Sequence, residues 1–81
     1  MIKINKNLIK NIIINNRDHI IDGINKINKN KYKICFVLDK KNKFLGSLND
    51  GDIRRGLING YNPNDEIDNI YNNNAKFVYN N

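Results

Sequence analysis

Hydrophobic positions change their spacing several times along the 81-residue chain, and each change predicts a different element. Three consecutive isoleucines in residues 11–16 (NIIINN) are typical of a short strand or extended segment. Residues 17–30 predict an amphipathic helix, with Asn16 or Asp18 as its N-cap. The apolar stripe of this helix recurs at helical spacing and comprises Ile20, Ile21, Ile24 and Ile27.

The central part of the chain predicts a β-hairpin. Residues 32–39 (YKICFVLD) are continuously apolar at their centre, as in a strand that is covered on both faces. The polar residues 39–43 (DKKNK) indicate a turn, and residues 44–49 (FLGSLN) indicate a second strand. Because the connection is short, the two strands are expected to be antiparallel neighbours.

The last third of the chain predicts a second helix, over residues 50–60, which ends at Asn59–Gly60. A loop containing Pro63 and one or two helical turns in residues 67–74 follow. The predicted order is therefore β-α-β-β-α, a small α+β (α/β) fold in which two helices pack on a small sheet.

Residues 75–81 (AKFVYNN) predict one further extended segment. Their pattern of three apolar or aromatic residues followed by two asparagines repeats that of residues 12–16. We therefore expect the chain to stop where a second, truncated copy of its own unit begins.

Composition narrows the classes of function. The net charge is +6, but the lysines are scattered through the first 43 residues, so we expect a solvated surface and no nucleic-acid partner. A single cysteine, Cys35, and a single histidine, His19, leave no disulfide framework and no zinc site. We read Cys35 as a small buried residue and His19 as a surface residue.

Neither a secretory signal nor an apolar run approaching the ~20 residues of a membrane span is present, so no membrane partner and a cytoplasmic location are expected. A chain this short, without a metal or a disulfide, is expected to gain stability by association.

Residues 44–57 (FLGSLNDGDIRRGL) hold the most informative cluster, in which Asp50 and Asp52 flank a glycine and precede Arg54 and Arg55. Carboxylates at the start of a helix stabilise it by ~0.3–1 kcal/mol, which predicts capping by Asp50 and allows it for Asp52. No nucleophile–base pair, metal cluster or glycine-rich phosphate loop is evident, so this chain by itself is expected to have no catalytic residues and no required cofactor.

The segment KICFVLDKKNKFLGSLNDGDIRRGL resembles the centre of a cystathionine-β-synthase-type (CBS) domain. Gly46 stands at the family glycine, Asp52 at the family aspartate, and Asn49 where the family has Thr or Ser. The resemblance covers residues 11–74, preceded by an N-terminal extension of residues 1–10. Asn49 is a departure, because an amide has a different reach from a hydroxyl.

The resemblance implies that two such motifs pair through their sheets and hold an adenosine nucleotide or a related ligand between them. It places Asp52 at the ribose and Asn49 at the ribose or phosphate. A carboxylate offers two acceptors to a ribose diol, and a guanidinium of Arg54 or Arg55 fits a phosphate. Ile14 and Phe36 would border the purine. The alternatives are capping by Asp52, solvated or ion-paired arginines, and core positions for Ile14 and Phe36.

The DGDIRR segment, in a unit that follows closely behind Met1, resembles the regulatory CBS pair that precedes the catalytic domain in bacterial sugar-1-phosphate nucleotidyltransferases. A similar segment occurs in the CBS pair of arabinose-5-phosphate isomerases, which follows their catalytic part. The expected function is a regulatory, ligand-sensing module cut from such a transferase, forming a homodimer through its sheet and helix face. The alternatives are an architectural dimerisation module without a ligand and, more remotely, a small basic nucleic-acid binder.

Overall fold

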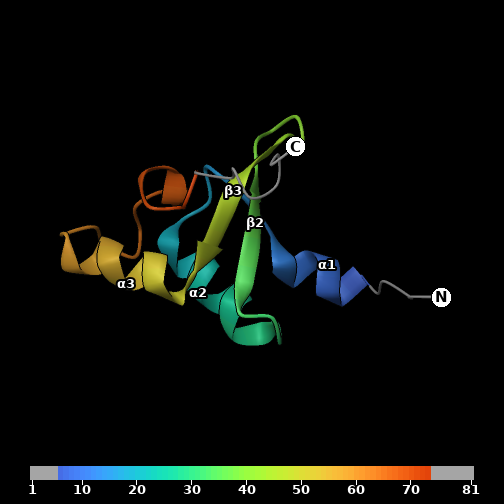
Figure 1. Ribbon diagram of the computed structural model, residues 1–81, viewed down its shortest axis with the longest axis horizontal. Helices are drawn as coiled ribbons and strands as arrows, with labels where there is room; N and C mark the ends of the chain where they lie inside the picture. Colours follow the sequence, from blue (N-terminus) through green and yellow to red (C-terminus); the bar gives the residue numbers. More distant parts are fainter. Residues whose placement is uncertain (1–5, 74–81) are drawn as a thin grey trace, which may run out of the picture.

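The computed structural model describes residues 6–73 and confirms a small α+β fold (Figure 1). The expected β-α-β-β-α order is present, preceded by one further helix. The elements are α1 (Lys6–Ile12), β1 (Ile13–Asn15), α2 (Ile20–Lys29), β2 (Ile34–Leu38), β3 (Phe44–Asn49), α3 (Asp50–Ile58) and the 3-10 turn η1 (Ile67–Asn69).

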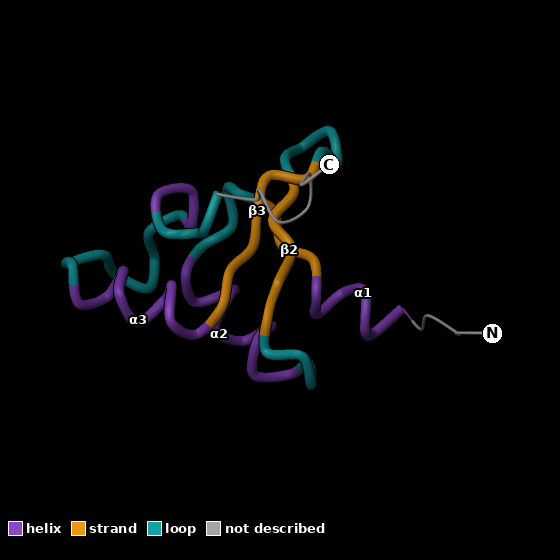
Figure 2. The backbone as a smooth tube through the Cα atoms, viewed as in Figure 1, coloured by secondary structure: helices purple, strands orange, loops and turns teal. Residues whose placement is uncertain are grey.

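The three strands form one mixed sheet in the order β1-β2-β3 (Figure 2). Strand β1 is parallel to β2, with Ile14 opposite Val37, and α2 makes the crossover that a parallel pair requires. Strand β3 returns antiparallel to β2, with Cys35 opposite Leu48. The hairpin was therefore predicted correctly, including the bounds of its second strand.

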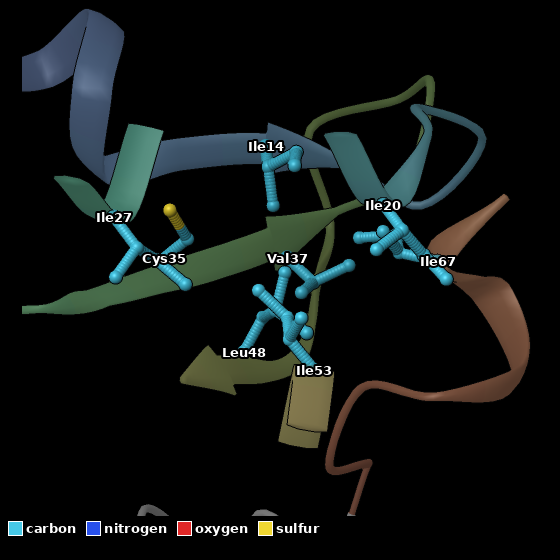
Figure 3. Close-up of a cluster of buried hydrophobic side chains, with 8 residues drawn as sticks. All are labelled: Ile14, Ile20, Ile27, Cys35, Val37, Leu48, Ile53 and Ile67. Atoms are coloured by element: carbon cyan, nitrogen blue, oxygen red, sulfur yellow. The ribbon is translucent and has the colours of Figure 1, made fainter. Parts of the chain in front are cut away.

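The hydrophobic core lies on one face of this sheet (Figure 3). Along β2, Cys35 and Val37 are buried whereas Phe36 between them is exposed, because successive strand side chains point to opposite faces. Strands β1 and β3, helices α2 and α3 and the turn η1 supply the rest of the cluster. Its members are Ile14, Ile20, Ile27, Cys35, Val37, Leu48, Ile53 and Ile67.

Helix α2 begins later than the sequence indicated, so the prediction of Asn16 or Asp18 as its N-cap was wrong. His19 is the N-cap, and the Asp22 carboxylate accepts a hydrogen bond from the His19 N–H at 2.9 Å. Asp18 instead accepts from the Asn15 N–H at 3.0 Å, which closes the turn after β1. The Asn16 N–H bonds to the Leu38 carbonyl, which attaches the start of this turn to β2.

Helix α1 was not predicted, and it shortens the expected strand over residues 11–16 to three residues. Its end is fixed by the side chain of Asn30, which donates to the Asn11 carbonyl at 2.8 Å. Asn30 is only 3% exposed, and its Oδ1 accepts from the N–H groups of Tyr32 and Lys33. One buried amide thus joins α1 to the turn between α2 and β2, a long-range contact without a local sequence signal.

The chain after η1 returns to the outer edge of β3. Ser47 and Asn72 exchange two backbone hydrogen bonds, at 3.0 and 2.8 Å. The extended segment predicted for residues 75–81, and with it the repeat, lies outside the described residues. Within residues 6–73, no helix has the length and apolar character needed to cross a membrane.

Gly46 permits this return of the chain. A Cβ atom built on Gly46 would overlap the Asn72 carbonyl oxygen and lie 3.0 Å from Asn73 Cα, both of which are backbone atoms. Gly51, in contrast, has no neighbour closer than 3.3 Å to such an atom.

We expect Gly46→Ala to lower the free energy of unfolding by about 1–3 kcal/mol, because the backbone must shift to admit the methyl group. The control Gly51→Ala is expected to be neutral or slightly stabilising, since alanine is favoured over glycine in a helix. Urea denaturation of both variants measures the difference. Equal stabilities of the two variants would contradict the close approach at Gly46.

Candidate ligand site at the start of α3

Strand β3 runs directly into α3, and a reciprocal pair of hydrogen bonds fixes the junction. The Asn49 Oδ1 accepts from the Asp52 N–H at 2.9 Å, and the Asp52 Oδ2 accepts from the Asn49 N–H at 3.0 Å. This capping box satisfies two backbone donors at the helix start. The amide of Asn49 therefore performs the capping that a hydroxyl performs at the same position.

The prediction that Asp50 caps α3 was wrong in its details. Asn49 is the N-cap and Asp52 closes the box, whereas Asp50 is exposed in the first turn. Within residues 6–73, the Asp50 side chain makes no hydrogen bond. Its remaining contribution is the favourable interaction of a carboxylate with the positive end of the helix dipole.

Asp52 is the central residue of the site. It is 6% exposed, and its second oxygen, Oδ1, accepts from Arg55 Nη2 at 2.6 Å. The Arg55 side chain is 68% exposed, so the ion pair joins a buried carboxylate to a guanidinium at the surface. Both Asp52 oxygens have a protein donor, yet each carboxylate oxygen accepts more than one hydrogen bond.

Asp52 and Arg55 line a cavity of about 180 Å³ between α3 and the segment that follows it. Four of the lining residues come from α3 and its C-cap, and three come from the segment that follows. The other lining residues are Gly56, Asn59, Tyr61, Asn69 and Ile70. Ligand pockets typically measure ~300–1,000 Å³, so this cavity accommodates a ribose or a phosphate but not a whole nucleotide.

Sequence reasoning missed the far wall of this cavity. Gly60, at φ +103°, reverses the chain, and the Tyr61 N–H then bonds to the Gly56 carbonyl at 3.0 Å. Asn59–Gly60 signalled the end of the helix, but the return of the chain against α3 depends on tertiary packing. Nothing in the local pattern places Tyr61 or Asn69 beside Asp52.

The structure brings together three of the six residues predicted for the ligand site: Asn49, Asp52 and Arg55. Arg54 is exposed and has no ion-pair partner within residues 6–73. Ile14 is 1% exposed and belongs to the core, so in this chain a purine cannot reach it. Phe36 lies on the opposite sheet face and does not line the cavity.

Phe36 is 37% exposed, and its ring contacts that of Phe44 with centroids 6.2 Å apart. It therefore belongs to a different surface from the Asp52 cavity.

The Cys35 thiol and the potential metal ligands are the groups that could make the site reactive. Burial raises the pKa of the Cys35 thiol to about 11, against an opposing effect of the Lys26 charge, so the thiol is neutral near pH 7. In the described part of the chain, no group of three or more His, Cys, Asp or Glu side chains is arranged to hold a metal ion.

Comparison of the sequence with protein-family models and with curated proteins finds no match.

We expect Asn49→Ala to lower the free energy of unfolding by about 0.5–2 kcal/mol, because the capping box loses its side-chain acceptor. The matched variant Asn49→Ser restores an oxygen acceptor and is expected to lose much less. Chemical denaturation monitored by circular dichroism measures both. A serine variant as unstable as the alanine variant would show that the amide has a role other than capping.

Proposed function

We propose that this chain is a regulatory, ligand-sensing module of the CBS type, in which two copies associate and each binds an adenosine nucleotide, in the cytoplasm. The observation that carries the proposal is the apolar sheet face opposite the helices. An incomplete ligand cavity supports it.

The open face is formed by the strand side chains that point away from the core. On β2 these are Ile34, Phe36 and Leu38, which alternate with the buried Cys35 and Val37.

The neighbouring strands extend this face, with Ile13 of β1 opposite Phe36 and Phe44 of β3 opposite Leu38. Within residues 6–73, Phe36 at its centre is left 37% exposed. On β3 the partners of Phe36 and Ile34 are the polar Ser47 and Asn49, so the apolar patch is centred on β2. An exposed apolar patch of this kind favours association with a second copy.

The Asp52 cavity supports the ligand-sensing part of the proposal. Its volume of about 180 Å³ suits a ribose, whose two hydroxyls match the free lone pairs of the Asp52 carboxylate. Arg55 uses Nη2 for the ion pair, which leaves its other donors for a phosphate. The base would then extend beyond this cavity, on the helix side of the sheet.

The parent protein in this proposal is a bacterial sugar-1-phosphate nucleotidyltransferase, with a sugar-phosphate isomerase as the second candidate. The resemblance of the DGDIRR segment supports this assignment. A second candidate function for the module itself is architectural dimerisation without a ligand. It is favoured by the fact that both Asp52 oxygens already have protein donors.

We expect the chain to sediment with twice its 9.5 kDa mass at high micromolar concentration, and Phe36→Lys to shift it to the monomer, because a buried charge opposes association. Tyr32→Lys is the matched control, since Tyr32 is exposed in the turn before β2. A monomeric wild-type chain, or dissociation by both substitutions alike, would refute association through the open face.

We expect AMP, ADP or ATP to raise the melting temperature of the dimer, because a ligand that binds the native state stabilises it. Asp52→Asn is expected to weaken nucleotide binding by about tenfold or more, the loss that follows from removing a charged hydrogen-bond partner. GTP serves as the comparison for base selectivity, and calorimetry measures each affinity.

The control for this variant is Asp22→Asn, because Asp22 occupies the equivalent position in the first turn of α2 and accepts from its N-cap N–H. Both variants weaken a helix start, but only the Asp52 variant is expected to lose binding. Absence of heat with every nucleotide would leave the architectural function.

A further inference from the structure

The carboxyl ends of the parallel strands β1 and β2 meet at one edge of the sheet. The start of α3 lies at the opposite edge, because Asn49 pairs with Ile34 at the beginning of β2. In open sheets with parallel strands and helical crossovers, the edge at the carboxyl ends is where ligands bind. Here it carries a cavity of about 330 Å³, nearly twice the volume at Asp52. The cavity is lined by Asn16, Arg17, Asp39, Lys40 and Lys41.

We propose that this cavity is a binding site for a phosphomonoester dianion, contacted by Arg17, Lys40 and Lys41. Three cations and one carboxylate line the cavity, and with Glu66, which pairs with Arg17, the local charge is still positive and attracts such a ligand. The three cations come from two different connections, one after β1 and one after β2, so the sheet brings them together.

Arg17 is positioned to present its guanidinium fork. Its backbone N–H donates to Asn15 Oδ1 at 2.9 Å, and its Nε pairs with Glu66 Oε1 at 2.8 Å. Glu66 therefore holds the side chain by one edge, and within residues 6–73 the two terminal nitrogens have no ion-pair partner. Terminal guanidinium nitrogens suit bidentate contact with two phosphate oxygens.

Asp39 lines the cavity together with Lys40 and Lys41, and its carboxylate organises the hairpin loop. Its Oδ1 accepts from the N–H groups of Lys41 and Lys43 at 2.8 and 2.9 Å, which folds the hairpin loop around the carboxylate. These contacts, with the Lys43 bond as the largest cause, lower the pKa of Asp39, so it is ionised at neutral pH. Lys40 and Lys41 remain exposed.

This site is independent of the proposed nucleotide site. The two cavities share no residue, and the Asp52 cavity is lined from α3 onward whereas this one is lined from residues 16–41. Loss of one site by mutation therefore leaves the other intact, and failure of either proposal can be recognised separately.

The test is a titration of the full chain with inorganic phosphate and, separately, with glycerol phosphate, at constant ionic strength. Backbone amide shifts observed by NMR report the site. Saturable shifts are expected at Arg17, Lys40 and Lys41, with affinity reduced about tenfold in Arg17→Gln, as for loss of a charged hydrogen-bond partner. Lys40→Gln is expected to weaken binding in the same direction.

The matched control is Lys31→Gln, because Lys31 is an exposed lysine that precedes β2 whereas Lys40 follows it. This variant is expected to keep the wild-type affinity. Tighter binding of glycerol phosphate than of inorganic phosphate would identify a small phosphorylated metabolite as the ligand, and the reverse would identify free phosphate. Shifts that do not saturate, or equal losses in the Lys31 and Arg17 variants, would overturn the proposal.

Discussion

Gly23 brings α2 so close to the sheet that an added methyl group would approach Leu48 Cδ2 to 2.7 Å. This contact determines much of the structure. It places Ile20 and Ile27 against β2, and each fully buried aliphatic side chain contributes roughly 1.5–3 kcal/mol. The cost of about 1 kcal/mol for glycine inside a helix is offset by this packing. Because α2 and α3 share one face, Phe36 on the other face of the sheet is left exposed within residues 6–73.

At the start of α3, one side chain has several roles. The Asp52 carboxylate closes the capping box, pairs with Arg55 and forms a wall of a small cavity. A residue that stabilises a helix start is held rigidly, so its remaining lone pairs have fixed directions. Capping and ligand contact are therefore compatible functions of one side chain, and the first makes the geometry of the second well defined.

The hairpin and α3 could be predicted from the sequence because their signals are local. The continuous apolar run of β2, the polar residues at the turn and Asn59–Gly60 at the helix end are each read from near neighbours. The expectation that β2 is covered on both faces was wrong within residues 6–73, because Phe36 is exposed. Helix α1 could not be predicted, because the buried amide of Asn30 fixes its end from 19 residues away. The N-cap of α2 was misplaced for a related reason, since Asp18 is used in the preceding turn.

The residues of the candidate site were likewise only partly predictable from the sequence. Asn49, Asp52 and Arg55 lie within seven residues, so a sequence pattern identifies them together, whereas Tyr61 and Asn69 reach the cavity only through the fold. Ile14 shows the opposite error, because an apolar strand residue is most often part of the core.

The return of the chain to β3 also protects one edge of the sheet against edge-to-edge polymerisation. Unpaired strand edges template growth into fibrils, and native proteins shorten or cover them. The two hydrogen bonds between Ser47 and Asn72 occupy the middle of the outer β3 edge, and the opposite edge is β1, only three residues long. Neither border of the described sheet offers a long row of free amides, so edge-to-edge growth between copies lacks the template it requires.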